Sequence, residues 1–178
     1  MTGKARLLEP QIPALRRYAW ALTRDHARAD DLVQDCLERA LSRWLLRRPD
    51  TDLRTWLFTI LHNQFISGQR AQRRRPLHDV LDETNEHAAS SPATQEGVLL
   101  GQDIIAQFAG LSEDHKEVLL LVGVEGMDYA NVASVLGIPM GTVMSRLSRA
   151  REQFRRMMEG ERPVLRPRGE GRSLRIMK

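Results

Sequence analysis

Side chains able to hydrogen-bond with nucleic acid recur at helical spacing in residues 140–156. Thr142, Ser145 and Arg149 fall on one face of the expected helix, and Arg146 stands at the flank of that face. An arginine fork fits the O6 and N7 atoms of guanine, and a hydroxyl group can contact a base or a phosphate. This chemistry recognises a ligand and breaks no bond. The four residues are therefore candidates for reading a DNA duplex.

Two short helices and a sharp turn must hold these side chains in place. The turn is the break Gly137-Ile138-Pro139. Apolar residues at helical spacing stand on both sides of it, namely Tyr129, Val132, Ala133 and Leu136 before the turn and Val143, Leu147, Ala150 and Phe154 after it. An apolar back and a polar front behind a tight turn are typical of a helix-turn-helix, whose second helix lies in the major groove. The pattern makes nucleic acid the leading partner.

A second candidate surface is the polar face of a helix expected over residues 29–46. It carries Asp31, Gln34, Asp35 and Glu38, with Arg39 nearby. Such a cluster has two interpretations, a plain solvated helix face or a docking surface for a basic or helical protein partner. Because an acidic surface is ill suited to DNA, a protein partner is the better functional interpretation.

The composition favours an all-α fold. The 178 residues suit one medium domain or two small ones, and 42% hydrophobic residues are enough for a core. Aromatic residues make up only 5%, and runs of alternating β-branched residues are absent. The sequence contains no uninterrupted stretch of about 18 apolar residues, so we expect no membrane span, and the N-terminus lacks an apolar signal core. The single cysteine, Cys36, suits a reducing cytoplasm, which is the location we expect.

Charge and periodicity divide the chain into two small helical domains. We expect a first domain at 1–75, an acidic linker at 76–97, a second domain at 98–158 and a basic disordered tail at 159–178. The linker contains five Asp and Glu residues and no Lys or Arg. If flexible, it has a root-mean-square span of roughly 25 Å and reaches about 70 Å when stretched. It could therefore tether two domains that sit well apart on one ligand.

Residues for catalysis or for holding a metal are not apparent. The five histidines are scattered and show no ligand spacing with Cys36, so we expect no structural zinc site. Neither a phosphate-cradling glycine loop nor a Ser-His-Asp pattern occurs. We expect no enzyme activity, no cofactor and no small-molecule substrate. Basic residues instead concentrate near 70–75, on the helix at 140–158 and in the tail, as phosphate binding requires.

Three segments in a fixed order resemble a known family. They are DDLVQDCLERAL, then RTWLFTILHNQFISGQRAQRR, and, after the acidic linker, LSEDHKEVLLLVGVEGMDYANVASVLGIPMGTVMSRLSRARE. Together they are similar to the bacterial group IV, or extracytoplasmic-function (ECF), sigma factors over about residues 10–158. The resemblance is specific because two different motif sets occur in the right order and at the right separation.

For the first domain, the resemblance to sigma region two implies two surfaces. The residues implied to dock on the polymerase core are Asp31, Gln34, Asp35, Glu38 and Arg39. Those implied to capture the non-template strand of the minus-ten element are Arg54, His62, Asn63, Arg70, Arg73 and Arg74. Capturing an extruded base costs about a few kcal/mol of unstacking, which contacts to the base edge must offset. Arginines near the end of the helix would hold phosphates and set affinity rather than sequence.

For the second domain, the resemblance to sigma region four implies recognition of the minus-thirty-five element. Thr142, Ser145, Arg146 and Arg149 would make the contacts. Met144 stands where many relatives have a lysine, so one phosphate or base contact is missing here. The family further implies promoter DNA, the RNA polymerase core and an anti-sigma factor as partners, with a role in stress-responsive transcription initiation. The acidic linker would follow the RNA exit path.

Two other functions fit parts of the sequence. An ordinary helix-turn-helix repressor or activator would bind duplex DNA tightly by itself. A sigma-like decoy would sequester an anti-sigma protein, but known decoys carry an added receiver domain for which this chain has no room. The arginine face of the second helix also argues against a decoy.

Overall fold

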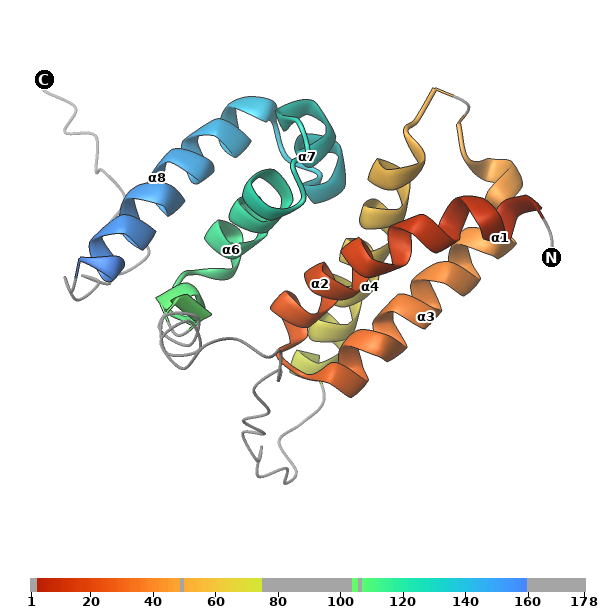
Figure 1. The fold of residues 1–178 in the computed structure, drawn as a ribbon, viewed down its shortest axis with the longest axis horizontal. Coiled ribbons are helices and arrows are strands. Elements are labelled where there is room, and N and C mark those ends of the chain that lie inside the picture. Colours follow the sequence, from red (N-terminus) through yellow and green to blue (C-terminus); the bar gives the residue numbers. More distant parts are fainter. Residues whose placement is uncertain (1–2, 49, 75–103, 106, 160–178) are drawn as a thin grey trace, which may run out of the picture.

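All the regular structure of the described residues is helical. The structure is a computed structural model and describes residues 3–48, 50–74, 104–105 and 107–159. Residues 3–74 form the N-terminal module and residues 104–159 the C-terminal module (Figure 1). The predicted linker at 76–97 and nearly all of the predicted tail lie outside the described residues. Within the described ranges, no helix is long and apolar enough to cross a membrane.

The N-terminal module contains four α-helices and two short 3-10 turns. They are α1 (Gly3–Leu8), η1 (Glu9–Gln11), α2 (Ile12–Thr23), α3 (His26–Ser42), η2 (Trp44–Leu46) and α4 (Leu53–Arg74). α3 packs against both α2 and α4. Small buried residues on α2 and α3, such as Ala19 and Ala40, allow the helices to approach closely. Leu57 and Phe58 of α4 are fully buried, and the Phe58 ring lies 5.3 Å from that of Tyr18.

The C-terminal module contains the predicted helix-turn-helix. Its elements are α6 (Glu113–Leu119), the π-helical turn η3 (Leu120–Val124), α7 (Tyr129–Leu136) and α8 (Met140–Met158). The Asp128 carboxylate caps α7 by accepting from the backbone N–H of Asn131 at 2.7 Å. Gly137 ends α7 with a φ of 64°, a left-handed conformation that glycine adopts without strain. These local signals confirm the prediction of a turn at residues 137–139.

The third helix of the chain begins and ends earlier than its sequence pattern predicts. α3 starts at His26, because Asp25 caps it by accepting from the Arg28 N–H at 2.8 Å. It ends at Ser42 rather than at residue 46, and Leu45 in the following turn is 91% exposed. Trp44 leaves the helical stripe to pack edge-on against Trp56, with ring centroids 6.2 Å apart. The short helix α1 was not predicted.

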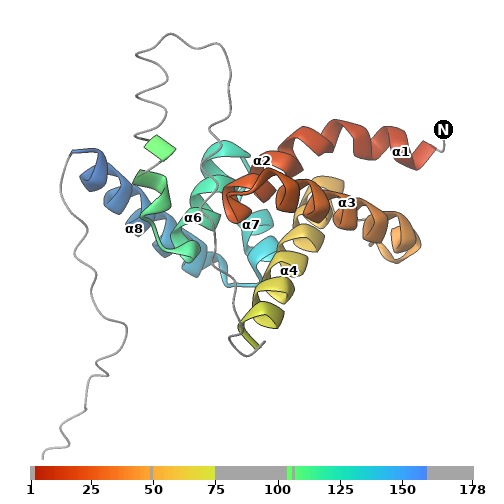
Figure 2. The same cartoon turned by 90° about the horizontal axis from the view of Figure 1, so that it is seen from below.

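The two modules pack directly against each other. α4 and α7 lie side by side, as the two views in Figures 1 and 2 show. One continuous buried cluster contains Leu57 and Leu61 of α4 together with Leu121, Val132 and Val135 of the C-terminal module. The predicted linker could tether the two domains well apart on one ligand. In this structure, apolar side chains of both modules are buried in a shared core, which removes them from water.

Candidate functional site

Helix α8 presents a polar face to solvent because its apolar face is buried. Val143, Leu147 and Ala150 are at most 2% exposed and pack onto the rest of the C-terminal module. Ser145 and Arg149 lie on the opposite side and are exposed, whereas Thr142 is half-buried. The Ser145 hydroxyl donates to the Thr142 carbonyl at 3.1 Å. The structure therefore brings three of the four predicted duplex-reading residues to one side of α8.

Arg146, at the flank of this face, is held by an ion pair within the C-terminal module. Its guanidinium is paired with the carboxylate of Asp114 on α6, with Nη2 and Oδ2 3.1 Å apart, and the side chain is 26% exposed. The pair holds α8 against α6, the helix on which it packs. In this arrangement Arg149, rather than Arg146, is the arginine that α8 exposes most fully at the predicted site.

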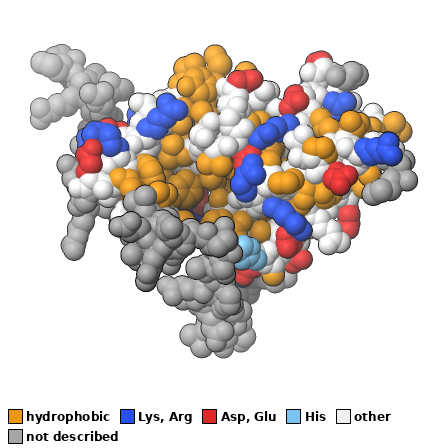
Figure 3. All heavy atoms as spheres, in the orientation of Figure 1, with side chains coloured by type: hydrophobic (Ala, Val, Ile, Leu, Met, Phe, Trp, Pro, Cys, Tyr) orange, Lys and Arg blue, Asp and Glu red, His pale blue; other side chains and the backbone are white. Residues whose placement is uncertain are grey.

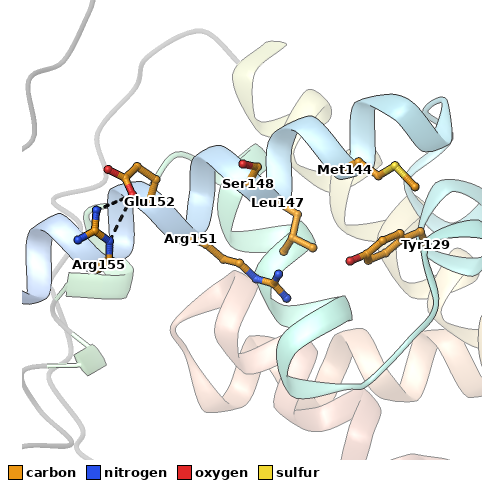
Figure 4. A pocket seen from close by; sticks show the side chains of 7 residues that line it. All are labelled: Tyr129, Met144, Leu147, Ser148, Arg151, Glu152 and Arg155. Carbon is orange, nitrogen blue, oxygen red and sulfur yellow. Dashed lines mark hydrogen bonds and ion pairs between the residues drawn. The ribbon is translucent and has the colours of Figure 1, made fainter.

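A shallow groove runs beside this face, between the start of α7 and the middle of α8 (Figure 4). Tyr129 and Met144 stand at one end of it, and Arg151 points into it from α8. Farther along α8, Glu152 accepts from Arg155 at 2.7 Å and from Arg156 at 2.8 Å, and these bonds lower the pKa of Glu152. The basic end of α8 is thus partly neutralised by its own carboxylate.

The predicted acidic surface forms one exposed face of α3. Asp31, Gln34, Asp35, Glu38 and Arg39 are all exposed, while the opposite face of α3 is buried in the module. The Gln34 amide donates to the Glu38 carboxylate at 3.0 Å, one helical turn away. Because α3 is anchored by its buried side, this polar face is fixed in position and open to a partner.

The predicted minus-ten residues on α4 divide into two groups. Asn63, Arg70 and Arg74 are exposed, and the Arg74 Nε donates to the Arg70 carbonyl at 3.2 Å. The backbone of Arg73 belongs to α4, but its side chain lies outside the described residues. Arg54 and His62 instead face the C-terminal module.

His62 is buried, at 6% exposed, where α4 meets α2 and α6. Its Nδ1 lies 3.3 Å from the Tyr18 hydroxyl, in hydrogen-bond contact, and 3.8 Å from Oε1 of Glu117 on α6. Burial lowers the pKa of His62 to about 4 and raises that of Glu117 to about 7. The two modules cover the imidazole here, so the predicted contact of His62 with DNA would require them to separate.

Arg54 is also occupied by the C-terminal module. Its Nη2 donates to the Glu125 carboxylate at 2.6 Å and to the Glu125 carbonyl at 2.9 Å. The same carboxylate accepts from Nε and Nη2 of Arg17 on α2, at 3.2 and 3.0 Å. The Glu125 side chain is 1% exposed, so two arginines compensate a fully buried charge.

Sequence reasoning missed Arg17, Glu117 and Glu125. One signal for Glu117 was available, since it stands three and four residues before Leu120 and Leu121 and so shares their buried side of the helix. A carboxylate at such a position needs a partner. No pattern of this kind marks Arg17 among the other arginines of the chain. Within the described ranges, no group of three or more His, Cys, Asp or Glu residues could hold a metal ion.

Comparisons with known proteins match both modules. The sequence model of the Sigma2 domain of PhyR matches residues 8–62, and that of Sigma-70 region 4 matches residues 101–154. The ECF RNA polymerase sigma factor EcfG of Rhodopseudomonas palustris is 38% identical over 143 residues, which are 80% of this chain and 78% of EcfG. The ECF RNA polymerase sigma factor SigC of Mycobacterium tuberculosis is 32% identical over 153 residues, or 84% of this chain and 82% of SigC.

A solved structure is similar over nearly the whole chain. It is the sigma factor RpoE in complex with the anti-sigma factor NepR from Bartonella quintana. The TM-score is 0.73 at 33% sequence identity, and the match covers 91% of this chain and 100% of that one.

Proposed function

Since this chain belongs to the ECF family of RNA polymerase sigma factors, we propose that its two modules divide the work of promoter recognition between them. The chain directs the bacterial polymerase core to specific promoters and assists their opening. The polymerase supplies the catalysis, and the chain itself is not an enzyme. It acts in the cytoplasm, where polymerase and chromosomal DNA meet.

The acidic face of α3 is the proposed contact with the polymerase core. Asp31, Asp35 and Glu38 are exposed on a helix whose other side is buried, so they meet a basic partner without rearrangement. The same negative charges would repel DNA phosphates. Gln34 and Arg39 extend the surface with hydrogen-bonding groups at either side.

The exposed part of α4 is the proposed contact with the separated minus-ten strand. Asn63 offers an amide that can bind the edge of an unstacked base. Arg70 and Arg74 follow two and three turns later on the same helix and would bind phosphates along the strand. Arg73 is included in this proposed contact because it lies between Arg70 and Arg74 in the sequence.

Helix α8 is the proposed reader of the minus-thirty-five duplex. Arg149 is exposed and would bind a guanine edge, a contact worth about 1–3 kcal/mol of discrimination. Ser145 and Thr142 would contact a base or a phosphate nearer the start of the helix. Arg146 would join them after leaving Asp114, or would brace α8 in its groove-binding position through that ion pair.

An anti-sigma protein is the proposed regulator. The similar structure from Bartonella quintana is a sigma factor bound to its anti-sigma factor, and its match to this chain extends over both modules. A partner that contacts both modules here would cover the acidic face of α3 and the polar face of α8 together. Such a partner should compete with polymerase core, and simultaneous binding of the two would argue against the proposal.

The observation that carries the proposal is the pairing of two exposed surfaces of opposite character on separate modules, an acidic α3 face and an arginine-bearing α8 face. Run-off transcription with purified core polymerase and a genomic promoter library tests it. The protein should bind core and yield discrete transcripts. Asp35→Ala should weaken core binding, whereas Glu9→Ala should not, because Glu9 is an exposed acidic residue of η1 and lies outside α3. Core binding no better than that of an unrelated protein would refute the proposal.

One observation favours the decoy function as a second candidate, namely the match of residues 8–62 to the Sigma2 domain of PhyR. A decoy would bind an anti-sigma partner but would give no transcript with core polymerase. The same run-off assay therefore separates the two functions. A stand-alone regulator would instead saturate promoter duplex in a gel shift without polymerase.

A further inference from the structure

The carboxylate of Glu125 occupies a ready-made anion site on the N-terminal module. Arg17 of α2 and Arg54 of α4 both donate to it, with N–O distances from 2.6 to 3.2 Å. The carboxylate is 1% exposed, but the side chains of Arg17 and Arg54 remain 55% and 35% exposed. Along the middle of the face in Figure 3, basic side chains lie over α2. The two guanidinium groups are thus presented at the surface once Glu125 is removed.

Among the residues that the structure describes, Arg17 and Arg54 form ion pairs with Glu125 alone, which is 108 and 71 positions away along the chain and belongs to the other module. Arg54 also has a buried Nε with no hydrogen-bond acceptor. Two neighbouring guanidinium groups with a spare donor are suited to an anion that binds arginine in bidentate fashion.

A phosphodiester meets that requirement. Like a carboxylate it carries one negative charge and two terminal oxygens, which arginine forks bind in bidentate fashion, and it adds ester oxygens as further acceptors. Arg54 stands on the helix whose exposed residues are the proposed contacts with the separated strand. A strand running along α4 toward α2 would bring a phosphate to the position that Glu125 now holds.

We propose that Arg17 and Arg54 form a phosphate site for single-stranded DNA and that Glu125 is its internal competitor, which keeps the two modules closed until the strand or polymerase displaces it. The proposal rests on the proposed function for the identity of the strand, but not for the competition itself. The shared apolar core adds to closure. Glu125 contributes the part of the closing interaction that depends on charge, and an anion can take over this contribution.

The experiment uses the free, full-length protein. Donor and acceptor dyes on Ala27→Cys and Ser134→Cys report closure by energy transfer, because both positions are exposed, one on each module, and Cys36 is buried. Anisotropy of a labelled short single-stranded DNA of mixed sequence reports binding. Glu125→Gln removes the competing charge. Glu113→Gln is the matched control, since it makes the same charge change on an exposed residue of the same module.

We expect Glu125→Gln to lower energy transfer and to tighten DNA binding roughly tenfold or more, the effect of freeing one charge-assisted hydrogen-bond site. Glu113→Gln should change neither signal. Arg17→Ala, at a half-exposed position that tolerates truncation, should also lower energy transfer but should not tighten binding, because it removes half of the site. Adding Arg54→Ala to Glu125→Gln should abolish the gain.

Three results would overturn the proposal. Unchanged energy transfer in Glu125→Gln and Arg17→Ala would mean that Glu125 does not hold the modules closed. If Glu113→Gln tightened DNA binding equally, the effect would be explained by the net charge of the protein alone. Opening without tighter DNA binding would exclude a phosphate site. None of these measurements involves polymerase, so they are independent of the transcription assay that tests the proposed function.

Discussion

The stability of the closed chain should depend on pH through two buried groups that face each other across the module boundary. Oε1 of Glu117 and Nδ1 of His62 lie 3.8 Å apart, and each side chain is 8% exposed. Burial raises the pKa of Glu117 to about 7, with Asp114 and Glu113 adding to the rise and Arg146 opposing it. Burial lowers the pKa of His62 to about 4. Between these pH values both groups are neutral, so they do not form an ion pair.

The two groups act on stability with opposite signs. Glu117 has a folded pKa above its ordinary value of 4.5, so its contribution is complete below pH 4.5 and is lost as the pH rises to about 7. His62 has a folded pKa below its ordinary value of 6.5, so its contribution is complete above pH 6.5 and is lost as the pH falls to about 4. Each loss amounts to about 3 kcal/mol, at roughly 1.4 kcal/mol for each pH unit. Between pH 4.5 and 6.5 the two slopes cancel.

Removing one of the two groups should therefore leave the pH dependence that the other gives to stability unopposed. In Glu117→Gln, the free energy of unfolding should rise relative to the parent protein by about 3 kcal/mol as the pH increases from 4.5 to about 7, because the opposing loss from Glu117 is gone. In His62→Gln, the free energy of unfolding should fall relative to the parent by a similar amount as the pH increases from about 4 to 6.5, because the gain from His62 is gone. Urea unfolding followed by circular dichroism at a series of pH values measures both differences.

The control is Glu9→Gln, which should track the parent closely because Glu9 is exposed and is not among the charges that shift the pKa of Glu117. The reasoning would be refuted if Glu117→Gln and the parent had parallel profiles over this range. A loss of stability that is largest between about pH 4.5 and 6.5 and fades on both sides of this range, for both Glu117→Gln and His62→Gln, would show a charged pair in place of two neutral groups.

Three further predictions concern the core, the duplex contact and a helix cap. Leu57→Ala should lower the free energy of unfolding by about 2–5 kcal/mol, because Leu57 is fully buried, and a loss below 1 kcal/mol in urea titrations would contradict its place in the core. Arg149→Ala should weaken holoenzyme binding to a selected promoter by about 1–3 kcal/mol, whereas Arg156→Ala, already paired with Glu152, should have little effect; equal losses in a competition assay would argue against specific readout. Asp128→Ala should cost about 1 kcal/mol by removing the cap of α7, and thermal melting by circular dichroism would show an unchanged midpoint if that cap were unimportant.

Local patterns in the sequence were enough to predict the all-α fold, the helix-turn-helix and both exposed polar faces. α8 spans Met140–Met158, as its periodicity predicts, and the turn at Gly137 has the left-handed backbone that ends a helix. The acidic residues of α3 share one side because residues three and four apart are neighbours on any helix. These features depend on helix geometry, which neighbouring residues set, and so they can be derived without knowing the packing.

Only the tertiary structure decided which charged groups are available. Arg54, His62 and Arg146 share the residue types and helical spacing of their exposed neighbours, yet each meets a carboxylate of α6 or of the turn before α7. The Arg54 partner stands 71 positions away in the chain, and no periodic pattern connects the two. Electrostatic pairing and burial depend on distance in space. The packing of the C-terminal module on α4 set that distance for Arg54 and His62, and the packing of α8 on α6 set it for Arg146.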